Sequence, residues 1–290
     1  MSLSIKEILR SDIRSLETSL DLDAGSARVE VQCLLQAVLR VNRAYLLAHL
    51  EQLLNREQHT CYAAMFERRR NGEPIAYILG EREFFGINFI VSPATLIPRH
   101  DTELLVELSL KRIPQTPREK KPFRILELGT GSGSVALSIA HARPDTEITA
   151  VDSSLDALQV AQANVQRLGI NTIRLMQSDW FSALRRDERF DMIVSNPPYI
   201  ALNDSHLSKG DLRFEPRSAL VSGADGLDDI RRIIGEAQSY LQTGGGLLLE
   251  HGYDHAERVR VLLQQASFGE VFSARDLSGV ERVSGGSIVV

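Results

Sequence analysis

The segment Asn196-Pro197-Pro198-Tyr199 could do chemistry on a flat polar group. It follows an apolar run, 190–195, that is typical of a buried strand. Two consecutive prolines cannot continue a strand ladder, because each lacks an N–H and has a fixed φ. The chain must leave the sheet just past the carboxyl end of that strand, where open α/β sheets bind ligands. The Asn196 amide, the proline carbonyls and the Tyr199 ring suit a planar amide-like NH2, although a proline-rich turn without chemical function would look the same.

A second candidate segment is rich in glycine. It follows another predicted strand, opens a predicted helix, and consists of Gly129, Thr130, Gly131, Ser132 and Gly133. Such a turn is tight, lets a ligand approach the backbone, and directs N–H groups at it from a helix N-terminus. Asp152 ends the next predicted strand, where its carboxylate can accept from both hydroxyls of a ribose. These features fit a nucleoside-bearing cofactor, either a nicotinamide dinucleotide or S-adenosylmethionine.

The glycine spacing and three further residues favour S-adenosylmethionine over a nicotinamide dinucleotide. The dinucleotide pattern is G-x-G-x-x-G, whereas here the third glycine comes one residue early. Glu127 would repel a pyrophosphate but suits a ligand that carries a sulfonium and an ammonium group. Asp179 and Trp180 follow a third strand and offer a carboxylate for the adenine N–H and an aromatic ring for its face. A helix N-cap is the alternative for Asp179, and core packing is the alternative for Trp180.

The composition is that of a soluble globular protein. The chain has 290 residues, of which 43% are hydrophobic and 24% charged, and its net charge is −5. It contains no apolar run of the ~18 residues that a membrane helix needs, and no signal peptide pattern, so we expect a cytoplasmic protein without a membrane partner. Cys33 and Cys61 are too few for a disulfide framework or a cysteine-based zinc site, and we expect no metal. The acidic balance argues against direct nucleic-acid binding, and the cluster 68–70 of three arginines is interpreted as a solvated helix end.

The periodicity predicts two domains and a linker. Residues 1–80 have helical apolar spacing, residues 81–98 read as a β-hairpin linker, and residues 99–290 alternate strands with helices. The alternation predicts an α/β fold with a mostly parallel sheet and helices on both faces. Residues 200–226 form a long polar connection, and connections of that length are usually functional or disordered.

The motifs, in this order and spacing, resemble those of class I S-adenosylmethionine methyltransferases that methylate amino groups: E-L-G-T-G-S-G, V-D, S-D-W and N-P-P-Y. The wider sequence is similar to the release-factor glutamine methyltransferases (the PrmC/HemK family). That similarity rests on segments 72–77, 83–84, 97–103 and 213–216 and covers nearly the whole chain. His100 stands where many members have proline.

The resemblance implies a Rossmann-like methyltransferase domain with a mostly parallel seven-stranded sheet, preceded by a small helical domain that helps to bind the substrate protein. It implies methyl transfer from S-adenosylmethionine, with S-adenosylhomocysteine as product, to the glutamine side-chain amide nitrogen in the Gly-Gly-Gln motif of bacterial class 1 peptide-chain release factors. Cofactor-binding positions carried over are Glu127, Gly129, Thr130, Gly131, Ser132, Gly133, Asp152, Asp179, Trp180 and Asn196. The glutamine would be held by Asn196, Pro197, Pro198 and Tyr199, of which Asn196, Pro197 and Tyr199 are the catalytic candidates.

Alternative functions use parts of the same pattern. An adenine-N6 nucleic-acid methyltransferase would grip the amine of a flipped base with the same N-P-P-Y segment. A ribosomal-protein glutamine methyltransferase would differ only in its partner surface. A nicotinamide oxidoreductase of the Tyr-x3-Lys type is disfavoured, since Asn203 stands four residues after Tyr199. A binding module without catalysis would not need the N-P-P-Y segment.

Overall fold

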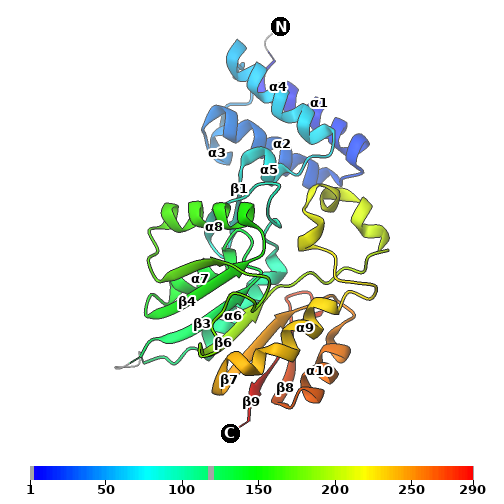
Figure 1. The fold of residues 1–290 in the computed structure, drawn as a ribbon. Helices are drawn as coiled ribbons and strands as arrows, with labels where there is room; N and C mark the ends of the chain where they lie inside the picture. Colours follow the sequence, from blue (N-terminus) through cyan, green and yellow to red (C-terminus); the bar gives the residue numbers. More distant parts are fainter. Residues whose placement is uncertain (1–2, 117–120, 290) are drawn as a thin grey trace. The chain divides into compact units, whose positions relative to one another are not determined.

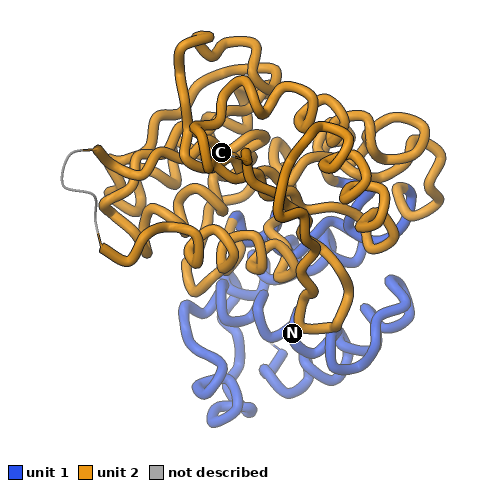
Figure 2. Tube along the Cα trace, turned by 90° about the horizontal axis from the view of Figure 1, so that it is seen from below, with its two compact units in different colours: residues 1–80, 208–214 blue, residues 81–207, 215–290 orange. Residues whose placement is uncertain are grey.

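The computed structural model describes residues 3–116 and 121–289. The chain divides into two compact units (Figure 2). Unit 1 comprises residues 1–80 together with the distant segment 208–214, and unit 2 comprises residues 81–207 and 215–290.

Unit 1 is helical. Its helices are α1 (Ile5–Leu20), α2 (Ala24–Leu39), α3 (Arg43–Ala48), α4 (Arg56–Arg70) and α5 (Ile75–Leu79), and its distant segment holds a 3₁₀ turn, η3 (Gly210–Phe214). A capping box starts α1, in which Ser4 and Glu7 each bond the other's backbone N–H, and Asn55 with Gln58 starts α4 in the same way. The apolar faces of the helices pack into one core around Ile5, Leu16 and Leu34.

The arginine cluster at the end of α4 is not uniformly solvated, which corrects the interpretation from sequence. Arg68 and Arg70 are exposed and pair with nearby glutamates, whereas Arg69 is only 4% exposed. The Arg69 guanidinium donates to the Glu30 carboxylate (2.6 Å) and to Asp211 Oδ1 (3.2 Å). Arg69 therefore joins α2 to the segment 208–214 within unit 1.

Unit 2 begins with the hairpin of β1 (Glu81–Phe84) and β2 (Ile87–Ile90), followed by a 3₁₀ turn, η1 (His100–Thr102). The strands of its large sheet are β3 (Phe123–Leu128), β4 (Thr146–Asp152), β5 (Ile173–Gln177), β6 (Phe190–Ser195), β7 (Leu241–Glu250), β8 (Phe268–Arg275) and β9 (Glu281–Ile288). Its α-helices are α6 (Glu103–Arg112), α7 (Ser134–Ala142), α8 (Leu155–Leu168), α9 (Asp228–Ala237) and α10 (Ala256–Gln265).

The seven strands lie in the order β5-β4-β3-β6-β7-β9-β8. The first five are parallel, and β9 is antiparallel to both β7 and β8. The chain runs from β3 outward to β5 and then returns to β6 on the other side of β3. The boundary between β3 and β6 is thus a topological switch point, where crossovers leave toward opposite faces and open a crevice.

Helices cover both faces of this sheet, as Figure 1 shows. One core packs α6, α7 and α8 on one face, and the other packs α9 and α10 on the opposite face. The predicted fold class is confirmed. The two strands nearest the carboxyl end of the chain, β8 and β9, form the antiparallel edge of the sheet. No helix within residues 3–116 and 121–289 combines the length and apolar character that a membrane span requires.

The long connection 200–226 contains three short 3₁₀ turns and no longer helix. Its ends meet: the Ile200 N–H donates to the Leu220 carbonyl (2.8 Å), and the Leu202 N–H donates to the Gly223 carbonyl (2.9 Å). The residues just before Leu220 are therefore held next to the carboxyl end of β6.

Candidate active site

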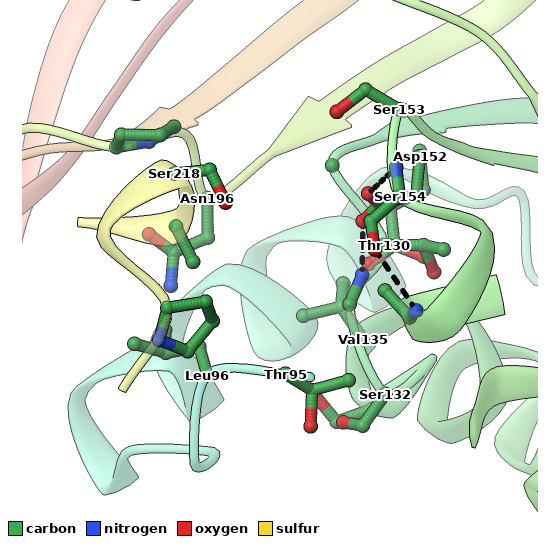
Figure 3. A pocket seen from close by; sticks show the side chains of 18 of the residues that line it. Thr95, Leu96, Thr130, Ser132, Val135, Asp152, Ser153, Ser154, Asn196 and Ser218 are labelled. Carbon is green, nitrogen blue, oxygen red and sulfur yellow. Dashed lines mark hydrogen bonds between the residues drawn. The ribbon is translucent and has the colours of Figure 1, made fainter. Parts of the chain in front are cut away.

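A pocket lies in unit 2 at the carboxyl ends of β3 to β6 (Figure 3). The residues proposed from sequence that line it are Glu127, Gly129, Thr130, Gly131, Ser132, Asp152, Asp179, Trp180, Asn196 and Pro198. In the view of Figure 3, Asn196 lies on one side of the pocket, and Asp152 lies with Thr130 on the other. The fold thus brings the proposed cofactor residues and the N-P-P-Y segment to one hollow. Gly133, Pro197 and Tyr199 do not line it.

The glycine turn joins β3 to α7. Gly129 and Thr130 both donate their N–H to the Val151 carbonyl (2.9 Å), which fixes the turn against β4. Gly131 has a φ of +55°, and a Cβ there would meet no atom within 4 Å, so its surface faces open space in the pocket. Gly133 serves packing instead, since a Cβ there would lie 2.9 Å from Leu137 Cδ1.

Glu127 is a buried acid at the end of β3. The Thr130 hydroxyl and the Ala136 N–H donate to its carboxyl group, so it ties the turn to the first residues of α7. Burial raises the pKa of Glu127 to about 8, with the nearby Asp152 carboxylate acting in the same direction. A buried acid with no cationic partner among the described residues suits a ligand that brings its own positive charge.

Asp152 at the end of β4 organises the opposite wall. Its two oxygens accept from the Gly131 N–H (2.8 Å) and the Ser154 N–H (2.9 Å). These bonds link the glycine turn to the start of α8. Each carboxylate oxygen accepts more than one hydrogen bond, so the group retains capacity for a pair of ligand hydroxyls.

Asp179 and Trp180 form the wall after β5. Turns and no helix follow Asp179, so it is not an N-cap. Its side chain is 61% exposed and pairs with Arg232 of α9 through both oxygens (2.9 and 3.0 Å). Trp180 has a φ of 51°, packs against the core beneath α9, and its ring edge lies 3.5 Å from where a Gly129 Cβ would stand. Trp180 thus both packs in the core and faces the pocket.

Asn196 directly follows β6 and presents a defined edge of its amide. Its Nδ2 donates to the Thr102 hydroxyl (3.1 Å), which leaves Oδ1 as the acceptor on the remaining edge. Pro197 is buried, and Pro198 lines the pocket. The Tyr199 hydroxyl donates to Glu250 Oε1 (3.3 Å), which fixes the ring, and burial raises the Tyr199 pKa well above its ordinary value.

Sequence reasoning missed two walls of the pocket. One is formed by residues 94–98 with Thr102, before α6, and the other by residues 216–219 of the long connection. The two walls are joined where the Arg99 guanidinium pairs with the buried Glu215 carboxylate. The signal was present, since Arg99 and Glu215 both belong to segments of the family resemblance.

Asn164 on α8 is a second missed residue. It is fully buried, and its amide exchanges hydrogen bonds with the backbone of Ile90 (2.7 and 3.0 Å) while also donating to the Ser132 carbonyl (2.9 Å). It therefore holds the hairpin and the glycine turn together. The spacing of α8 was a usable signal, since Asn164 lies three residues after Ala161 and seven after Ala157 on the buried face of the helix.

No cluster of three His, Cys, Asp or Glu side chains in the described ranges could hold a metal ion. The polar groups of the pocket are instead backbone amides, serine and threonine hydroxyls, carboxylates and one oriented carboxamide. Such a set can bind a cationic, ribose-bearing ligand and accept hydrogen bonds from a planar NH2 group.

Comparisons with protein families agree with this geometry. Residues 17–80 match the model of the PrmC N-terminal domain, and residues 102–211 match the model of the methyltransferase small domain. The release factor glutamine methyltransferase of Salmonella typhimurium is 48% identical over 91% of this chain and 93% of its own length. The Escherichia coli protein of the same name is 48% identical over 95% of this chain and 96% of its own length.

Solved structures share the fold. The catalytic domain of hMettl16, in complex with MAT2A 3′UTR hairpin 6, aligns with a TM-score of 0.57 at 16% sequence identity and covers 78% of this chain and 82% of its own. At that identity the likeness concerns the architecture of the sheet and its helices.

Proposed function

This chain belongs to the family of release factor glutamine methyltransferases, and from that membership and the geometry of the pocket we propose how it performs the reaction. It is an S-adenosylmethionine-dependent methyltransferase that acts on the side-chain amide nitrogen of a release-factor glutamine. We propose the Gly-Gly-Gln motif of bacterial class 1 release factors as the acceptor. The observation that supports this proposal most directly is the Asn196 amide, whose Nδ2 is bound to Thr102 so that Oδ1 remains to accept from an NH2 group.

The pocket fits S-adenosylmethionine. The Glu127 carboxyl is buried and lacks a cationic partner in the described chain, as a site for the ammonium or sulfonium group requires. Asp152 would accept from the ribose hydroxyls, Trp180 would lie against the adenine, and Gly131 leaves room for close approach of the ligand. When bound, the cofactor supplies an electrophilic methyl group on a cationic sulfur.

Asp179 would accept from the adenine N–H, in competition with Arg232. Because an exposed ion pair is worth only ~0–1 kcal/mol, that competition is easily overcome.

The chain's own task is to orient a poor nucleophile. An amide nitrogen reacts weakly because its lone pair is delocalised into the carbonyl. Hydrogen bonds from the glutamine NH2 to Asn196 Oδ1 and to the Pro197 carbonyl would favour positive charge on the nitrogen and aim it at the methyl group. Tyr199 would pack on the amide plane. The N–C bond forms as the C–S bond breaks, the electron pair stays on sulfur, and the nitrogen then releases one proton to water.

We propose that unit 1 recognises the release factor. Residues 17–80 match the PrmC N-terminal domain, and the pocket that includes the catalytic candidate Asn196 is lined entirely by residues of unit 2, which supports a binding role for unit 1. The acceptor takes part in translation termination, and we therefore propose a cytoplasmic location. We propose a corresponding division of labour. Residues 1–80 recognise the substrate, residues 81–98 form a hairpin linker, and residues 99–290 carry out catalysis.

One labelling experiment tests the proposal. The purified protein is incubated with methyl-labelled S-adenosylmethionine and a bacterial release factor, the same factor with Gln→Ala in Gly-Gly-Gln, or duplex DNA. We expect label on the wild-type factor alone. Label on DNA would indicate adenine methylation instead, and equal amounts of label on both factors would exclude the Gly-Gly-Gln glutamine as the acceptor.

A further inference from the structure

Glu250 is a buried carboxyl group directly behind the N-P-P-Y segment. It is the last residue of β7. The register pairs Leu249 of β7 with Ser195 of β6, so Glu250 and Asn196 are the next residues on these two neighbouring segments. Only 1% of Glu250 is exposed, and it does not line the pocket. The Tyr199 hydroxyl donates to its Oε1 (3.3 Å), and the Thr102 hydroxyl, a donor to the carboxylate form, opposes the rise of its pKa.

The order of donors and acceptors in this chain of contacts fixes the Asn196 amide. A threonine hydroxyl has one proton to donate and two lone pairs. When Thr102 donates its proton to the Glu250 carboxylate, it can only accept from Asn196, and it therefore selects Nδ2. The two ends of a carboxamide are nearly equal in size, so sterics alone would not prevent a 180° flip. A flipped Asn196 would present NH2 to a substrate NH2, donor against donor.

We propose that Glu250 is a positioning residue of the methyl-transfer reaction, which acts through Thr102 to keep Asn196 Oδ1 turned toward the substrate amide and through its bond to Tyr199 to hold that ring. This inference rests on the proposed function, and no atom of Glu250 need touch the substrate. Glu250 would thus orient both side chains, Asn196 and Tyr199, that are proposed to bind the glutamine.

Burying the Glu250 carboxyl group costs free energy of folding, and this cost supports a functional role for the residue. Glu250 Oε2 is buried and has no hydrogen-bond partner within residues 3–116 and 121–289. Burial raises the Glu250 pKa to about 7, and Asp101 adds to the increase while Arg282 opposes it. A buried polar atom that makes no hydrogen bond costs free energy of folding. A position that mattered only for stability would therefore be better filled by an apolar residue.

The variant Glu250→Met tests the proposal, because it removes the acceptor and leaves the Thr102 hydroxyl free to donate to Asn196 Oδ1. We expect kcat on the release factor to fall roughly 10- to 100-fold, as for orienting partners in other sites. KM, the Kd of S-adenosylmethionine and Tm should change little. Thr102→Val should lower kcat similarly, and the double variant should be no worse than either single one. Glu188→Met removes another buried carboxyl, paired with Arg174 away from the pocket, and should keep kcat.

An activity-independent measurement accompanies the kinetics: the NMR signals of the Asn196 side-chain NH2, identified by their absence in Asn196→Ala. Their hydrogen exchange should be slow in the wild type and faster in Glu250→Met. Wild-type kcat in Glu250→Met, or a loss of kcat matched by losses of Tm and cofactor affinity, would overturn the inference. Unchanged exchange would do so as well. Failure of the wild-type enzyme to label any release factor would instead refute the proposed function, and the exchange measurement would still decide the role of Glu250.

Discussion

Asn196 is the residue on which the proposed chemistry depends most, since its Oδ1 is the one side-chain acceptor assigned to the glutamine. We expect Asn196→Ala to lower kcat by about 10²- to 10³-fold, the usual loss when one preorganised hydrogen-bonding group is removed from a reacting centre. The Kd of S-adenosylmethionine should change by much less, because the cofactor contacts proposed for Glu127 and Asp152 remain. Steady-state kinetics and calorimetric titration measure the two quantities. Unchanged kcat in a folded variant would remove Asn196 from the mechanism.

Glu127 should couple cofactor binding to pH. Its pKa of about 8 means that the acid is mostly protonated at pH 7 before the cofactor binds. A cationic ligand favours the carboxylate, so binding should release protons, and affinity should rise between pH 6 and pH 7. Titration in buffers of different ionisation enthalpy measures that release. Glu127→Gln should bind more weakly and release fewer protons; the same proton release in this variant would contradict the role assigned to Glu127.

At the scale of elements, the arrangement of the site follows from the switch point between β3 and β6. The glycine turn leaves β3 toward α7, and the N-P-P-Y segment leaves β6 on the neighbouring strand, so their residues meet at one edge of the sheet. The Ser195 hydroxyl, which donates to the Leu128 carbonyl (2.8 Å), ties these two strand ends together. Cofactor and acceptor residues thus share one rigid support.

Arg69 should determine the stability of unit 1. Arg69→Met would leave the Glu30 carboxylate, whose pKa burial already raises, without its ionic partner. Removal of one member of a buried ion pair costs about 3–5 kcal/mol. Urea unfolding followed by helical circular dichroism measures the loss. The matched control is Arg70→Met on the same helix, where an exposed pair is broken and the change should stay within about 0.5 kcal/mol. Equal effects of the two variants would refute the distinction.

At the scale of the whole molecule, stability should fall as pH rises from 7 to 8. The folded-state pKa values of Glu127 and Glu250, about 8 and about 7, lie above the ordinary value of 4.5. An acid with a raised pKa contributes stability that is complete below its unfolded-state pKa and is lost as pH rises through its folded-state pKa. Below pH 6.5 the buried His251 and His255, whose pKa values burial lowers, act in the opposite direction, so the window begins at pH 7.

Denaturant unfolding of the cofactor-free protein at a series of pH values measures this dependence. Glu127→Gln and Glu250→Met should each flatten it. A free energy of unfolding that is constant or rises from pH 7 to pH 8 would contradict the prediction. Saturating S-adenosylmethionine should reduce the decrease, because a bound cation near Glu127 stabilises its ionised form.

The sequence by itself determined the fold class, the family and most of the pocket. These follow from local patterns: the alternation of strand and helix spacing, a glycine turn that needs positive φ, and two prolines that end a strand at Asn196. Because parallel strands carry their functional residues at the same end, the order of motifs along the chain was enough to bring Glu127, Asp152 and Asn196 together.

Only the tertiary structure decided which side chains are buried and what they touch. Arg68, Arg69 and Arg70 are identical in type, yet one is inside, because its partners Glu30 and Asp211 come from distant parts of the chain. Thr102 and Glu250 likewise lie far from the N-P-P-Y segment in sequence. The orientation of the Asn196 amide depends on the direction of the hydrogen bonds among Asn196, Thr102 and Glu250. That direction is a property of packed neighbours, and residue spacing along the chain does not encode it.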